Sequence, residues 1–91
     1  MAVTVRIPTT LRPLSGGAST VEVGPGTLAD VIGALEVAHP GFRDRLLDAD
    51  GSLRKFVNVF VDDDDVRYLD GLDTKVPEGQ TVSIIPAVAG G

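Results

Sequence analysis

The sequence has 91 residues, within the size range of one compact domain, and it contains no cysteine. The absence of thiols excludes disulfide bonds, thiolate zinc sites, iron–sulfur clusters and cysteine nucleophiles, and the single histidine, His39, argues against a histidine-rich metal site or a catalytic triad. Thirteen acidic and eight basic residues give a net charge of −5, which argues against nucleic acid or a membrane surface as the main partner. A partner protein with a basic surface would complement this negative charge better.

The chain carries no recognisable targeting or membrane-spanning signal. No apolar run approaches the ~20 residues of a membrane span, and the N-terminal residues alternate at once instead of forming a basic and then apolar signal region. We therefore expect a cytoplasmic protein.

The N-terminal region predicts a β-hairpin. Val3, Val5 and Ile7 alternate with polar residues, as in a strand with one buried face, and a proline ends the pattern. Residues 9–19 contain proline and glycine and predict a wide turn. Residues 20–23 then alternate again and supply the second strand.

A helix is predicted to follow the hairpin. Thr27 lies three residues before Asp30, which is the spacing of a capping box. Apolar residues then recur at helical spacing: Leu28, Val31, Ile32 and Leu35. The helix should end near Ala38, because the residue before Pro40 disfavours helical geometry. Residues 42–55 predict one further helical turn, packed on the core through Phe42, Leu46 and Leu47, and then a loop.

The remaining residues predict three more strands and an α+β fold. The strands are expected at 56–61, 66–68 and 81–85, with a turn at 62–65, a loop at 70–79 and Pro86 ending the pairing. The order β-β-α-β-β-β and a right-handed crossover allow the last strand to pair beside the first. The architecture that fits best is a β-grasp, the ubiquitin-like roll: a mixed sheet of four to five strands with one main helix on one face. Residues 1–86 would form the domain and 87–91 a flexible Gly-Gly tail.

The Gly90-Gly91 ending is the most unusual feature of the sequence. Glycine has no Cβ, so such a tail can enter a narrow channel in another protein. Five residues reach at most roughly 17 Å from the domain. The Gly91 carboxylate could therefore enter a partner's active site, led by Val88, Ala89 and Gly90, but it is a poor acyl donor until it is activated, for example as an acyl-adenylate.

Strand parity predicts a docking surface beside this tail. If Val57, Val59 and Val61 face the helix, the residues between them face away from it. Phe56, Phe60 and Ile85 would then form an exposed apolar patch suited to partner binding. The alternative, equally open from the sequence, is that residues 42–55 fold over this face and bury it.

The run Asp62-Asp63-Asp64-Asp65 has the wrong spacing for an EF-hand calcium site, because it lacks the alternate ligands, the central glycine and the closing glutamate. We interpret it as a solvated acidic turn that could steer a basic partner. His39 is interpreted as a structural residue at a helix end, and we expect no metal site.

Several segments resemble the ThiS/MoaD family of ubiquitin-like sulfur carriers, and together they cover nearly the whole chain. They are Thr27-Leu28, Val82-Ser83-Ile84-Ile85 and Pro86-Ala87-Val88-Ala89-Gly90-Gly91. Others are similar to the CysO-like branch, the carriers of a bacterial cysteine-synthesis route: Ile7-Pro8-Thr9, Leu11-Arg12-Pro13, Gly16-Gly17, and Phe56-Val57-Asn58-Val59 through Asp65-Val66-Arg67.

The resemblance implies a carrier cycle in which this chain is a protein co-substrate and not an enzyme. An E1-like adenylyltransferase/sulfurtransferase would use ATP to adenylate Gly91 and then replace the adenylate with sulfur, giving a C-terminal thiocarboxylate. In the CysO-like branch, this group attacks an aminoacrylate on a PLP-dependent cysteine synthase, and a metal-dependent peptidase releases cysteine and regenerates Gly91. The carrier itself is expected to hold no cofactor stably.

Three alternatives remain open at this point. A carrier for molybdopterin, thiamine or a sulfur-containing natural product would share Gly91 but serve another acceptor enzyme. A ubiquitin-like protein modifier would conjugate Gly91 to lysines. A pure interaction module would not need the terminal glycines.

Overall fold

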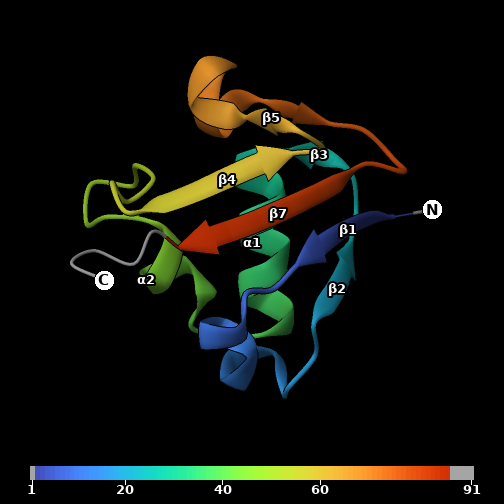
Figure 1. Ribbon diagram of the computed structural model, residues 1–91, viewed down its shortest axis with the longest axis vertical. Helices are drawn as coiled ribbons and strands as arrows, with labels where there is room; N and C mark the ends of the chain where they lie inside the picture. Colours follow the sequence, from blue (N-terminus) through green and yellow to red (C-terminus); the bar gives the residue numbers. More distant parts are fainter. Residues whose placement is uncertain (1, 87–91) are drawn as a thin grey trace.

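The computed structural model describes residues 2–86 and shows a five-stranded mixed sheet with the main helix packed on one face (Figure 1). The strand order in this sheet is β2-β1-β7-β4-β5, and β3 and β6 form a separate two-stranded ladder. The elements are β1 (Val3–Arg6), β2 (Thr20–Val23), β3 (Gly26–Thr27), α1 (Leu28–Ala38), α2 (Phe42–Leu46), β4 (Val57–Val61), β5 (Asp64–Asp65), β6 (Lys75–Val76) and β7 (Thr81–Pro86). This is the expected α+β, β-grasp plan.

The last strand pairs beside the first, as the sequence predicted, and it lies in the middle of the sheet. β1 pairs antiparallel with β2, and β7 pairs parallel with β1 on one side and antiparallel with β4 on the other. A parallel pair needs a long connection between its strands, and here residues 7–80, which include β2, both helices and β4, connect β1 to β7. The strand that leads to the C-terminal residues is thus held along both edges.

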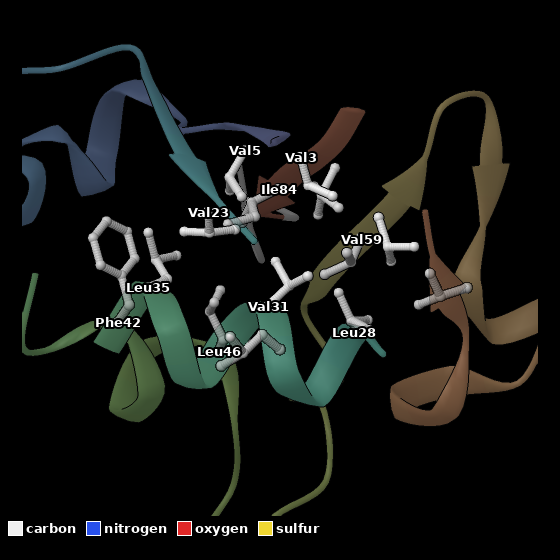
Figure 2. Packing of buried hydrophobic residues seen from close by; sticks show 14 of the residues in the cluster. Val3, Val5, Val23, Leu28, Val31, Leu35, Phe42, Leu46, Val59 and Ile84 are labelled. Atoms are coloured by element: carbon white, nitrogen blue, oxygen red, sulfur yellow. The ribbon is translucent and has the colours of Figure 1, made fainter. Parts of the chain in front are cut away.

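Helix α1 begins with the predicted capping box. The Thr27 hydroxyl accepts a hydrogen bond from the Asp30 amide at 3.2 Å, and the Asp30 carboxylate accepts one from the Thr27 amide at 3.1 Å. Two amides that the helix leaves unpaired are satisfied in this way. The helix then buries the four predicted core residues, which are Leu28, Val31, Ile32 and Leu35. Figure 2 shows Leu28, Val31 and Leu35 pointing toward the sheet.

The short helix α2 packs on the same side of the sheet as α1. Phe42 and Leu46 are fully buried and belong to the same core cluster as Leu35 (Figure 2). The Glu36 carboxylate of α1 accepts hydrogen bonds from the amides of Gly41 and Arg43, at 3.1 and 2.8 Å, which fixes the start of α2. The further helical turn predicted after residue 41 is confirmed.

Two segments that the sequence left as loops contain short helices or strands. The predicted wide turn after β1 forms a 3-10 helix over Thr9–Ser15, closed by Gly16 in the left-handed conformation at φ 68°. The predicted loop over residues 70–79 contains a 3-10 helix, Gly71–Asp73, and the strand β6, whose two residues pair with β3 at the start of α1.

The prediction of a return strand at residues 66–68 is wrong. The strand that pairs with the end of β4 is β5, and Val66–Tyr68 forms a 3-10 helix. The Asp65 carboxylate accepts a hydrogen bond from the Arg67 amide at 2.9 Å, which turns the chain out of the sheet. That turn buries Val66 completely and leaves Tyr68 89 % exposed, an arrangement that strand alternation does not allow.

Two strand ends also differ from the prediction. Phe56 lies in the turn before β4 and not in the strand itself, which starts at Val57. β7 continues through Pro86, which pairs with Val57, because a proline at the last position of a strand removes only one donor. Within residues 2–86, no helix is long and apolar enough to cross a membrane.

Candidate functional site

The central strand β7 carries the chain toward the predicted site residues Val88, Ala89, Gly90 and Gly91, which lie outside the described residues, as does the expected tail 87–91. The pairing of β7 with β4 persists to the last described residue, Pro86. Residue 87 is therefore attached directly to the best-anchored strand of the sheet.

Of the predicted apolar patch, Phe60 and Ile85 lie on the outer face of the sheet, away from α1, and Phe56 lies in the turn that leads into β4. Phe56 is 60 % exposed, Ile85 is 49 % exposed and Phe60 is partly buried. Ile85 lies directly opposite Asn58, and Phe60 lies opposite Ser83, so Phe60 and Ile85 are diagonal neighbours across β4 and β7. Diagonal neighbours lie about 7–8 Å apart, within reach of an aromatic side chain.

Strand parity is confirmed on β4 and β7, the strands that carry Phe60 and Ile85. The alternate residues of β4 and β7 that face α1 are buried: Val57, Val59, Val61, Val82 and Ile84. Because α2 packs beside α1, the segment 42–46 lies on the core side of the sheet and does not fold over the patch. The alternative that residues 42–55 bury this face is wrong for Phe56 and Ile85, because both side chains remain exposed.

Arg67 holds the segment that carries Phe56, and no local sequence pattern indicates this role. Its guanidinium donates hydrogen bonds to the carbonyl oxygens of Arg54, Lys55 and Val57, at 2.8, 3.0 and 2.7 Å, and to the side-chain oxygen of Asn58. Such convergence on four acceptors suits the planar fork of arginine. The turn before β4 is therefore fixed from a residue nine or more positions further along the chain.

The acidic run after β4 is partly structural. The Asp62 carboxylate accepts a hydrogen bond from the Thr81 amide at 3.1 Å, and Asp62 takes a left-handed φ of 54°. Asp65 caps the next 3-10 helix. Among residues 2–86, no group of three or more His, Asp or Glu side chains is arranged to hold a metal ion. Asp63 and Asp64 remain exposed.

His39 ends α1, where its amide donates to the Leu35 carbonyl at 2.8 Å. Its ring packs edge-on against Phe42, with 6.5 Å between the ring centroids. These contacts agree with the structural role predicted for this residue.

Comparison with known proteins relates almost the whole chain to one family. Residues 5–91 match the model of the ThiS family. The chain is 48 % identical over 93 aligned positions to the sulfur carrier protein CysO of Mycobacterium tuberculosis, with 100 % of both chains covered.

The chain is also similar to a protein solved in a complex and to a small modifier protein. A chain of the Amycolatopsis orientalis BexX/CysO complex superposes with a TM-score of 0.93 at 46 % identity, over 99 % of this chain and 100 % of that one. The small archaeal modifier protein 3 of Haloferax volcanii is 40 % identical over 65 residues, which cover 71 % of this chain and 70 % of the relative.

Proposed function

Because the chain belongs to the ThiS family, we propose that it is a sulfur carrier whose C-terminal Gly91 accepts sulfur as a thiocarboxylate and donates it to an acceptor enzyme. The observation that carries this proposal is the 48 % identity to a CysO sulfur carrier over the full length of both chains. The family match includes Gly90 and Gly91, the residues that the chemistry needs.

Activation has to come from a partner, because a carboxylate is a poor acyl donor. In the proposed cycle an E1-like enzyme directs a Gly91 carboxylate oxygen onto the α-phosphorus of ATP, which forms the acyl-adenylate and releases pyrophosphate. A sulfide-level donor then attacks the carbonyl carbon, and the bond to AMP breaks. The product is a thiocarboxylate, a stronger nucleophile than the carboxylate it replaces.

The carrier domain contributes recognition and reach in this proposal. The apolar patch docks on the partner, and residues 87–91 extend Gly91 by at most roughly 17 Å from the end of β7. The exposure of Phe56 and Ile85, next to the strand from which those residues continue, supports this division of roles. The Amycolatopsis similarity supports it too, since that chain occurs in a complex with BexX. Catalytic groups and cofactors, including the ATP, belong to the partners.

For the acceptor we propose a PLP-dependent cysteine synthase, followed by a metal-dependent peptidase that releases cysteine and regenerates Gly91. The identity to CysO supports this choice over acceptors in molybdopterin, thiamine or natural-product synthesis. The compartment that fits such metabolic enzymes is the cytoplasm.

A protein-modifier role is the second candidate, because the chain is 40 % identical to a small archaeal modifier protein over two thirds of its length. A modifier would form an isopeptide bond between Gly91 and lysines of other proteins. Denaturing gels of cell extract with tagged carrier separate the two functions: covalent ladders support conjugation, and a single free band supports sulfur transfer.

The deciding experiment is intact-mass analysis after incubation with the E1-like enzyme, ATP and a sulfide donor. The carrier should gain the mass difference between oxygen and sulfur, and a variant lacking Gly91 should not. No mass gain with an enzyme that activates another carrier in parallel would refute the proposal.

A further inference from the structure

A second surface feature lies beside the apolar patch and is basic. Where β1 and β7 end, the structure forms a groove of about 470 Å³, which we call the arginine groove; among its lining residues are Arg6, Arg12, Thr20, Ser83 and Ile85. Arg6 pairs with Ser83 on β7 and with Thr20 on β2, so the groove crosses three strands. Ile85 belongs to both features, and the groove therefore continues directly into the apolar patch.

The two arginines of this groove have no acidic partner among residues 2–86. The one ion pair in that part of the chain joins Arg54 to Asp48, far from the groove in sequence. Glu22 shares the outer face with Arg6, but its carboxylate forms no ion pair with either arginine. In a chain with a net charge of −5, two arginines that pair with no carboxylate of the described residues form a local concentration of positive charge.

Arg12 is also held in place. It is partly buried, and its Nε donates a hydrogen bond to the Ile7 carbonyl oxygen at 3.2 Å. This bond fixes the plane of the guanidinium and leaves its terminal nitrogens as donors. A guanidinium fixed in this way recognises a carboxylate with a smaller loss of side-chain freedom than a mobile one.

We propose that the arginine groove receives an acidic side chain, Asp or Glu, of the activating enzyme when the apolar patch docks on it. This inference rests on the proposed function and names the chemistry of its partner. Two observations favour a partner carboxylate: the positive charge of two arginines that pair with no carboxylate among residues 2–86, and the continuity of the groove with the apolar patch through Ile85. The contact sets the orientation in which the carrier binds and increases the association rate.

The test compares two charge reversals, Arg6→Glu and Arg45→Glu. Both side chains are exposed, and the change in net charge is the same, but Arg45 lies on α2, on the opposite side of the sheet from the groove. We expect Arg6→Glu to raise the KM for the carrier in thiocarboxylate formation about tenfold with kcat unchanged. The Arg45→Glu variant should keep the parent KM within about twofold, because only long-range steering changes.

Two further measurements test the contact independently: the salt dependence of KM, and the rescue of Arg6→Glu by a matching charge reversal in the enzyme. The difference between the variants should shrink at high salt, since exposed charges are screened. Replacing the contacting carboxylate of the enzyme with lysine should restore the KM of Arg6→Glu, and a scan of the enzyme's surface carboxylates identifies it. Arg12→Gln should also raise the KM for the carrier. Thermal unfolding of this variant checks that its fold is retained.

Equal KM values for Arg6→Glu and Arg45→Glu would overturn the proposal. Faster activation of Arg6→Glu would overturn it as well, because that result means that the groove holds the C-terminal residues of this chain and competes with docking. If the parent carrier gains no sulfur at all, the proposed function fails. If it gains sulfur and the variants behave alike, the function stands and only the groove contact fails.

Discussion

The Arg67 guanidinium donates a hydrogen bond to the Val57 carbonyl oxygen at 2.7 Å, at the point where β4 begins. It also binds the carbonyl oxygens of Arg54 and Lys55, on the other side of Phe56 in the sequence. One side chain therefore fixes the backbone on both sides of the most exposed residue of the apolar patch.

We expect Arg67→Lys to loosen this segment. A single ammonium group cannot reach the same four acceptors, so the free energy of unfolding should fall by about 1–2 kcal/mol. The KM of the carrier for the activating enzyme should rise, because Phe56 loses its fixed position. Urea denaturation and steady-state kinetics measure the two effects, and Arg45→Lys, at an exposed position on α2, is the control. Unchanged stability of Arg67→Lys would contradict the role assigned to this residue.

Phe56→Glu tests the apolar patch. The side chain is 60 % exposed, so we expect the stability to change by no more than about 0.5 kcal/mol. The added charge should weaken docking of the carrier on the activating enzyme. We expect kcat/KM for thiocarboxylate formation to fall at least about tenfold. The matched control is Val37→Glu, at an 85 % exposed apolar residue on α1, which faces away from the patch. Equal losses in the two variants would rule out a specific docking role.

Phe42→Ala tests the core side of the sheet. This ring is fully buried, and its removal leaves a cavity that should cost about 3–5 kcal/mol. A small domain has a total stability of about 5–15 kcal/mol, so the variant should unfold at much lower denaturant concentration. Phe56→Ala, the same substitution on the exposed face, should cost far less. Similar midpoints for the two variants would contradict the placement of α2 in the core.

Two glycines should respond to alanine with opposite signs. Gly33 lies within α1 with no atom within 4 Å of an added Cβ, so Gly33→Ala should stabilise the protein by about 0.5–1 kcal/mol. Gly41 has φ 113°, and an added Cβ would lie 2.9 Å from a methyl carbon of Leu14. Gly41→Ala should therefore destabilise it by about 1–2 kcal/mol. Thermal unfolding of both variants checks the signs, and a stabilised Gly41→Ala would be inconsistent with the structure.

The regular elements could be read from the sequence because each carries its own local signal. These signals specify the type of each element and its boundaries within a few residues. They are the alternation of Val3 and Val5, the capping box of Thr27 and Asp30, and the β-branched run of β4. The same alternation indicated which side of β4 faces the helix, and hence that Phe60 lies on the other side. The terminal glycines pointed to the chemistry proposed for Gly91.

Only the tertiary structure decided the features that join distant parts of the chain. A short segment such as Val66–Tyr68 has too few residues for a periodic signal, and burial of Val66 overrode its strand propensity. The Arg67 contacts with the start of β4 and the meeting of Arg6 with Ser83 depend on strand register and helix packing. Local sequence specifies which face of an element is apolar, but long-range packing determines what that face meets.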